Sequence, residues 1–134
     1  MLEADMLNEG YEYLLRQDEY KIVKREVPFL SRCIDVVLVK QDNTLISIEF
    51  KVSKWRHAIE QANNHKLGSD AAYICLPKRT ITEKLRQAVT NAGIGLLLYD
   101  ANANEKMSVV IPAPKQNDNV PAFRDILMST LSKL

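Results

Sequence analysis

The chain of 134 residues has a mass of 15.3 kDa, a hydrophobic fraction of 46% and a charged fraction of 26%. These values are typical of one globular domain with an ordinary hydrophobic core, and they exclude global disorder and low-complexity composition. No apolar run reaches the ~18 residues that a membrane span needs, and the first residues lack the basic start and apolar core of a signal peptide. We therefore expect a cytoplasmic protein with no membrane partner.

The charge is distributed unevenly along the chain. The formal net charge is only +1, so the protein as a whole is not a polycation that nucleic acid attracts. Residues 1–30 nevertheless carry seven acidic and four basic side chains, whereas residues 51–86 carry eight basic and three acidic side chains. The basic middle of the chain is either part of a nucleic-acid surface or an ordinary solvated face.

The first part of the chain predicts one helix followed by three strands. Residues 2–17 lack proline and carry apolar side chains at helical spacing, so they predict a helix. Residues 20–27 then predict a strand that ends at Pro28. The ranges 32–40 and 44–51 predict a hairpin, because turn residues separate two runs that are apolar on both faces. Strands apolar on both faces indicate a sheet that is covered on both sides.

The second part alternates helices and strands. The expected elements are a helix at 54–66, a strand at 71–76, a helix at 82–92, a strand at 94–99 and an edge strand at 106–111. Ser53 is a candidate N-cap for the first of these helices, and Thr80 or Thr82 for the second, which Gly93 closes.

The order of these elements predicts an α/β fold. It contains an α-β-β-β-α-β core, which indicates a three-layer sandwich around a mixed central sheet. Residues 1–111 are expected to form one domain. Residues 112–121 form a polar connector bracketed by prolines, and the amphipathic helix within 120–134 is expected to pack on the domain or at a dimer interface.

Three charged residues interrupt or end the apolar strands of the hairpin. They are Asp35, Glu49 and Lys51. Charged side chains rarely occupy such positions unless they are paired or bind a metal ion. Glu49 and Lys51 are two residues apart on one strand and therefore point to the same face of the sheet.

The length of the hairpin loop decides whether Asp35 joins them. A three-residue loop, residues 41–43, pairs Asp35 with Glu49, and Asn43 suits the left-handed conformation that such a loop requires. A two-residue loop pairs Asp35 with Phe50 and puts the carboxylates on opposite faces. The first register is the one that builds a site. Two opposed carboxylates repel each other unless a cation lies between them, which favours Mg²⁺ or Mn²⁺.

These residues resemble the motif of the PD-(D/E)xK nuclease superfamily, which has the restriction-endonuclease-like fold. The match consists of Asp35 on one strand, the run 49–51 (Glu-Phe-Lys) on the next, and Gln61 on the helix that follows. The order of elements over roughly residues 1–100 also matches the family core. The sequence departs from the pattern at Ile34, where the family name has proline.

The resemblance implies a Mg²⁺- or Mn²⁺-dependent nuclease that acts on DNA. It implies that Asp35 and Glu49 are catalytic metal ligands, that Lys51 acts on the attacking water or the transition state, and that Gln61 is a supporting polar contact. Many members add a carboxylate from the first helix. The candidates for this additional metal ligand are Glu9 and, behind it, Glu12.

Further residues are candidates for contacts to nucleic acid around this site. They are Lys54, Trp55, Arg56, Lys78 and Arg79. The aromatic ring of Trp55 either stacks on a base or packs against the start of its own helix. A homodimer is a possible assembly for cutting both strands of a duplex.

Two other interpretations remain open at the level of sequence. The first is the same fold without catalysis, serving as a nucleic-acid-binding or protein-interaction module, which the nearly neutral net charge favours. The second is an unrelated small α/β protein in which the three charged residues are structural. The form of the substrate stays undetermined between duplex, single-stranded and branched DNA and RNA.

Overall fold

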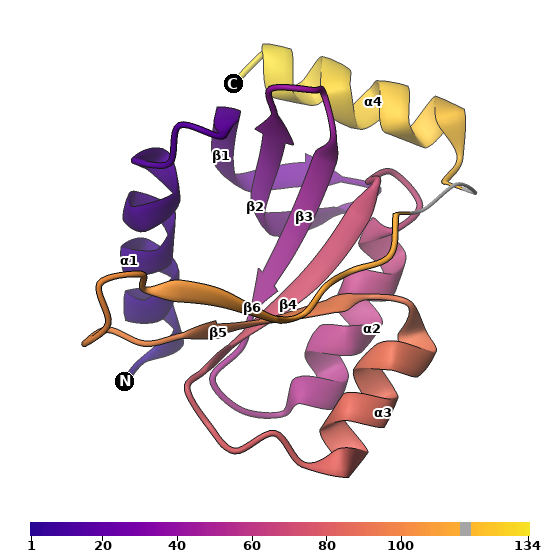
Figure 1. Ribbon diagram of the computed structural model, residues 1–134. Helices are drawn as coiled ribbons and strands as arrows, with labels where there is room; N and C mark the ends of the chain where they lie inside the picture. The colour runs from indigo at the N-terminus through magenta and orange to yellow at the C-terminus, as the bar shows by residue number, and fades with distance from the viewer. Residues whose placement is uncertain (116–118) are drawn as a thin grey trace.

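One sheet of six strands, in the order β1-β2-β3-β4-β5-β6, organises the computed structural model, which describes residues 1–115 and 119–134 (Figure 1). The elements are α1 (Glu3–Leu15), β1 (Tyr20–Phe29), β2 (Arg32–Lys40), β3 (Leu45–Phe50), α2 (Trp55–His65), β4 (Ala71–Pro77), α3 (Glu83–Ala92), β5 (Gly95–Tyr99), β6 (Met107–Ile111) and α4 (Pro121–Ser132). Every predicted helix and strand is present. The connector 112–121 includes residues 116–118, which lie outside the described part of the chain.

The sheet is mixed, as the order of elements predicted. β1, β2 and β3 pair antiparallel, β3, β4 and β5 pair parallel, and β6 pairs antiparallel with β5. Each parallel pair needs a crossover connection, and α2 and α3 supply them. The carboxyl ends of β3, β4 and β5 therefore lie at one edge of the sheet.

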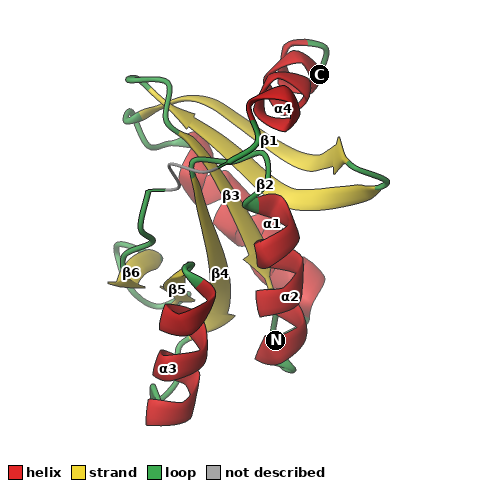
Figure 2. Cartoon of the chain, turned by 90° about the vertical axis from the view of Figure 1, so that its right-hand side faces the viewer, coloured by secondary structure: helices red, strands yellow, loops and turns green. Residues whose placement is uncertain are grey.

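Helices cover both faces of the sheet, which confirms the α/β sandwich (Figure 1). On one face α1 packs through Met6, Gly10 and Leu14 against a cluster that contains Phe50. On the other face α2 and α3 enclose a second cluster with β4 and β5. Figure 2 shows α4 beside β1, where Leu127 and Leu131 are buried against the first three strands.

The hairpin of β2 and β3 has the three-residue loop. Val37 pairs with Ser47 and Val36 with Ile48, the register that places Asp35 opposite Glu49. Asn43 adopts the left-handed conformation with φ of 71°, as predicted for the last residue of such a loop. The register that builds a site is therefore the one the protein adopts.

Two boundary predictions are wrong and one is confirmed. β1 continues through Pro28 to Phe29, because β1 is an edge strand and proline there costs no ladder bond on its outer side. Ser53 does not cap α2; the N-cap is Lys54 in the left-handed conformation, without a side-chain cap. Thr82 does cap α3, since its hydroxyl accepts a hydrogen bond from the Leu85 amide at 3.1 Å.

Candidate active site

Asp35 and Glu49 lie where β2 and β3 separate. The last backbone pair between the two strands is Val36 with Ile48. Beyond this pair, carboxylate side chains accept the hydrogen bonds of the backbone amides. The Phe50 amide donates to Asp35 Oδ2 at 2.8 Å, and the Asp35 amide donates to Glu49 Oε1 at 3.3 Å. The two carboxylates are thus held side by side by bonds that cross between the strands.

The separation of the strands coincides with an irregularity in β1. β1 pairs with β2 at Arg25 and again at Val27, but the pair between Glu26 and Asp35 is absent from the ladder. Glu26 has φ of 51°, a left-handed conformation that kinks a strand. The β1–β2 hairpin changes direction at this kink, which lies opposite Asp35, the residue whose side chain bonds to β3.

Burial dominates the electrostatics of the two carboxylates. Glu49 is 2% exposed, and burial, together with the neighbouring Asp35 carboxylate, raises its pKa well above the usual range. Burial likewise raises the pKa of Asp35, although the hydrogen bond from the Phe50 amide opposes this shift. A bound cation would reverse both shifts, because it favours the ionised form of each carboxylate.

Lys51 follows β3 and lies close enough to act on both carboxylates. Its positive charge lowers the pKa of Asp35 and of Glu49, against the larger effect of burial. Its amide donates to the Cys75 carbonyl at 3.0 Å, which continues the pairing with β4 and fixes the backbone at this point. Lys51 itself is half-buried.

Gln61 and His65 lie one turn apart on α2. Gln61 is half-buried, and His65 is 2% exposed with Nδ1 at 3.4 Å from Glu49 Oε1. Burial, with the charge of Arg32, lowers the pKa of His65 to about 4, so this contact joins two neutral groups near pH 7. His65 was not among the predicted site residues. Its position four residues after Gln61 places both side chains on one face of the helix, and this spacing could have indicated it.

The carboxylates expected from α1 lie elsewhere. Glu9 accepts a hydrogen bond from the Tyr99 hydroxyl at 2.8 Å, and Glu12 is exposed. The carboxylate of α1 that acts on Asp35 is Glu3, whose charge adds to burial in raising the pKa of Asp35. Glu3 Oε1 also accepts a hydrogen bond from the Val52 amide at 3.0 Å, which ties the start of α1 to the end of β3.

Basic side chains surround two hollows at the carboxyl edge of the parallel strands. One hollow is lined by Val52 with Lys78 and Arg79, directly beyond the ends of β3 and β4. The other is lined by Trp55 with basic neighbours that include Lys84. Their complete polar and basic linings are Lys78, Arg79, Thr80 and Thr82 in the first, and Lys54, Arg56 and Lys84 in the second.

Trp55 contacts both Arg56 and the core. The Arg56 guanidinium carbon lies 4.4 Å from the centroid of the Trp55 ring, and Trp55 also packs against the cluster beneath α2 and α3. The packing interpretation of Trp55 agrees with these contacts, and stacking on a base stays a prediction. Another basic residue of this edge, Lys78, forms an ion pair: its Nζ lies 3.5 Å from Asp100 Oδ2.

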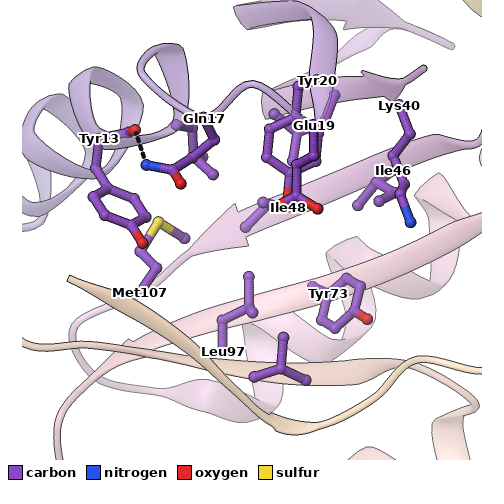
Figure 3. Close-up of a pocket in the computed structure, with 13 residues that line it drawn as sticks. Tyr13, Gln17, Glu19, Tyr20, Lys40, Ile46, Ile48, Tyr73, Leu97 and Met107 are labelled. Carbon is purple, nitrogen blue, oxygen red and sulfur yellow. Dashed lines mark hydrogen bonds between the residues drawn. The ribbon is translucent and has the colours of Figure 1, made fainter. Parts of the chain in front are cut away.

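The cavity in Figure 3 is separate from these residues. It has a volume of about 250 Å³ and lies on the α1 face, where Tyr13, Tyr20 and Tyr73 surround an aliphatic floor that includes Ile46 and Ile48. On β3 the side chains of Ile46 and Ile48 point to the face opposite that of Glu49. This cavity is therefore not part of the candidate active site.

The described residues contain neither a helix that could span a membrane nor a preformed metal cage. No helix there is long and apolar enough to cross a membrane. No group of three or more His, Cys, Asp or Glu side chains in residues 1–115 and 119–134 is arranged as a metal cage. The carboxylates of Asp35 and Glu49 alone would leave most positions of an ion to water and substrate, a coordination that suits Mg²⁺ or Mn²⁺.

Comparisons with known proteins place the fold. No family model matches this chain, and no curated protein matches it significantly. A solved protein of unknown function from Silicibacter pomeroyi superposes with a TM-score of 0.70 at 20% identity, over 99% of this chain and 86% of that chain. A repair endonuclease from Pyrococcus abyssi has a TM-score of 0.53 at 21% identity. EndoMS in a complex with dsDNA has a TM-score of 0.54 at 16% identity.

These similarities establish a nuclease-like fold. The match covers 72% of this chain for the Pyrococcus enzyme and 85% for EndoMS, but only 46% of each of those chains. This protein therefore corresponds to less than half the length of either endonuclease. The predicted α/β sandwich with a mixed sheet is confirmed.

Proposed function

We propose that this protein is a metal-dependent nuclease that hydrolyses phosphodiester bonds in DNA through a metal-activated water. The observation that carries this proposal is that Asp35 and Glu49 lie side by side where β2 and β3 separate, with Lys51 close enough to act on them. Two neighbouring buried carboxylates are costly to ionise together, and a cation bound between them would offset their repulsion.

The donor set fits a hard divalent cation. Asp35 and Glu49 offer carboxylate oxygens, and a cation between them would offset the repulsion by which Asp35 adds to burial in raising the pKa of Glu49. Mg²⁺ or Mn²⁺, when bound, would lower the pKa of a coordinated water and polarise a phosphoryl oxygen. The two carboxylates must release their protons before they can act as ligands.

The remaining residues of the site have roles that need no metal geometry. Lys51 would donate to a phosphoryl oxygen as negative charge develops, since its positive charge already acts on both carboxylates. Gln61 would hold a polar contact on the α2 side. The hollow beside Val52, lined by Lys78 and Arg79, would take the phosphates that flank the scissile bond.

DNA is the proposed substrate, and a second copy of the chain is proposed where both strands of a duplex are cut. The repair endonuclease and the EndoMS–dsDNA complex support the choice of DNA through their fold. The basic edge beyond β3 and β4 supports it through charge, even though the net charge of the whole chain is only +1.

Cleavage of supercoiled plasmid and of single-stranded circular DNA tests the proposal. We expect wild-type protein to nick or cut in Mg²⁺ or Mn²⁺, and we expect Glu49→Ala to lose this activity. Glu60→Ala is the matched control, because Glu60 is exposed on α2. Activity that survives in Glu49→Ala would place the chemistry elsewhere or in a contaminant.

A binding module without catalysis is the second candidate, favoured by the near-complete burial of Glu49 and the low net charge. It predicts DNA binding without cleavage and no Mn²⁺ binding that depends on Glu49. Isothermal titration of Mn²⁺ into wild type and Glu49→Ala distinguishes the two candidates. Only the nuclease requires that wild type bind Mn²⁺ more tightly than Glu49→Ala.

A further inference from the structure

One buried nitrogen in the candidate site lacks a hydrogen-bond partner. His65 Nδ1 is the sole buried side-chain nitrogen or oxygen in the described residues for which the structure gives no partner. The His65 side chain is 3% exposed, and its Nδ1 lies 3.4 Å from Glu49 Oε1, a separation longer than an ordinary hydrogen bond. A buried polar atom without a partner is destabilising, so the position requires an explanation.

Glu49 Oε1, the oxygen that His65 Nδ1 approaches, already accepts one hydrogen bond. Glu49 Oε1 accepts the Asp35 amide at 3.3 Å, so this oxygen faces donors on the protein side. A neutral imidazole carries its proton on one nitrogen, and the neighbour of that nitrogen selects which one. If Glu49 is ionised by a bound cation, its Oε1 becomes a strong acceptor, and a proton on Nδ1 satisfies both groups.

We propose that His65 is a positioning residue that donates its Nδ1–H to Glu49 Oε1 and thereby presents Oε2 to the metal ion. This inference rests on the proposed function. Carboxylates that bind metal ions are themselves held by hydrogen bonds, and loss of such an outer partner typically costs about 10–100-fold in metal affinity. His65 acts through Glu49 and does not touch substrate.

The position of His65 is fixed by the packing of its helix. Ala58 and Ala62 on α2 are buried against the sheet, and His65 on the same helix is buried as well. His65 also borders a cavity of about 210 Å³ with Phe29 and Leu67.

The tautomer is measurable in the wild-type protein without any substitution. Long-range ¹H–¹⁵N spectra of ¹⁵N-histidine-labelled protein in saturating Mg²⁺ report which ring nitrogen carries the proton. We expect His65 to be the Nδ1–H tautomer, whereas the exposed His57 on the same helix serves as an internal reference. A bare Nδ1, with the proton on Nε2, would overturn the proposal.

Two substitutions distinguish positioning by Nδ1 from simple filling of space. The amide nitrogen of Asn can replace Nδ1 of His, whereas that of Gln corresponds more closely to Nε2. We expect His65→Gln to weaken Mn²⁺ binding about 10–100-fold and His65→Asn to retain affinity within a few-fold of wild type. His57→Asn is the matched control and should not change binding.

The outcomes separate this inference from the proposed function. If wild type and Glu49→Ala bind Mn²⁺ equally, or neither binds it, the proposed metal site fails and the inference fails with it. If binding depends on Glu49 but His65→Gln matches wild type, the positioning role is overturned and the proposed nuclease stands. Equal losses in His65→Gln and His65→Asn would also overturn the specific role of Nδ1.

Discussion

Asp35 and Glu49 share hydrogen bonds across the parting of β2 and β3, and each carboxylate takes the place of a missing ladder partner. Asp35 Oδ2 accepts the Phe50 amide at 2.8 Å, while Glu49 Oε1 accepts the Asp35 amide at 3.3 Å. The same side chains therefore satisfy the backbone where the sheet splits and form the donor set of the candidate active site.

The pH dependence of stability should reveal the raised pKa of Glu49. Burial and the Asp35 carboxylate raise this pKa above 4.5, so the folded protein holds the proton more tightly than the unfolded chain. In EDTA the free energy of unfolding should therefore fall as pH rises from about 4.5 towards the folded pKa. Glu49→Gln should remove this loss and be more stable than wild type at pH 8 by about 1–3 kcal/mol.

Urea denaturation at pH 5 and pH 8 measures this effect. Glu60→Gln, at an exposed position of α2, controls for the general effect of removing one carboxylate. An unchanged difference between the two pH values in Glu49→Gln would show that Glu49 is ionised in the metal-free protein.

The basic edge should dominate binding to DNA. We expect Arg79→Ala to weaken binding several-fold at low salt and to reduce the slope of log K against log salt by about 0.7–0.9, because one phosphate contact is lost. Fluorescence anisotropy in EDTA measures binding without cleavage. Lys133→Ala, in an exposed position after α4, is the matched control. Equal effects of the two substitutions would mean that DNA does not contact this edge.

Asp70 should anchor α4 to the sheet. Its carboxylate accepts bonds from Arg124 at 3.0 Å, from the Leu45 amide at 2.9 Å and from Asn119 at 2.9 Å. Asp70→Ala leaves these donors unpaired, and we expect a loss of about 2–4 kcal/mol in urea denaturation. Asp125→Ala, exposed on α4, should change stability by less than about 0.5 kcal/mol. A similar small effect for Asp70→Ala would mean that α4 is held by its apolar contacts alone.

Acid should weaken the same anchor. Burial opposes ionisation of Asp70, but the bonds from Arg124, the Leu45 amide and Asn119 outweigh it and lower the pKa below 3.8. The stabilisation is thus complete above the unfolded value near 3.8 and is lost as pH falls through the folded pKa. Wild type should lose more stability than Asp70→Ala between pH 5 and pH 2.

Gly10 should be required for α1 to lie against Phe50. A Cβ at this position would stand 2.7 Å from Phe50 Cε2, and the Phe50 ring is 2% exposed. Gly10→Ala gains up to about 1 kcal/mol in helix propensity but should still destabilise the protein by about 1–3 kcal/mol through overpacking. The double variant with Phe50→Leu should recover part of this loss, which thermal denaturation of the four proteins of the cycle measures. A Gly10→Ala protein as stable as wild type would contradict the tight contact.

Much of this site was predictable from local sequence. The turn residues and the tolerance of Asn43 for positive φ allowed the register that brings Asp35 opposite Glu49, beside the alternative of a two-residue loop, and the structure has the first of these registers. The periodicity of apolar residues predicted every helix and strand to within a few residues. Such features depend on neighbours in the chain, and local rules therefore describe them well.

Other features depended on contacts between distant segments. The candidates from α1 were Glu9 and Glu12, and only the packing of α1 on the sheet identified Glu3 as the carboxylate that acts on Asp35. The contact of His65 with Glu49 joins residues that are 16 positions apart through the packing of α2 on β3. No local pattern contains the direction in which a helix crosses a sheet.

The amino-acid sequence by itself determined the order of elements and the mixed α/β sheet, because periodicity and turn chemistry act over a few residues. The structure decided between the two hairpin registers and thereby placed Asp35 opposite Glu49. The tertiary structure alone decided that Glu3 and His65 accompany these carboxylates and that Arg56 covers Trp55. It also decided how strongly Glu49 is buried. These properties follow from how helices pack on the sheet, and packing is set by the whole core rather than by any one segment.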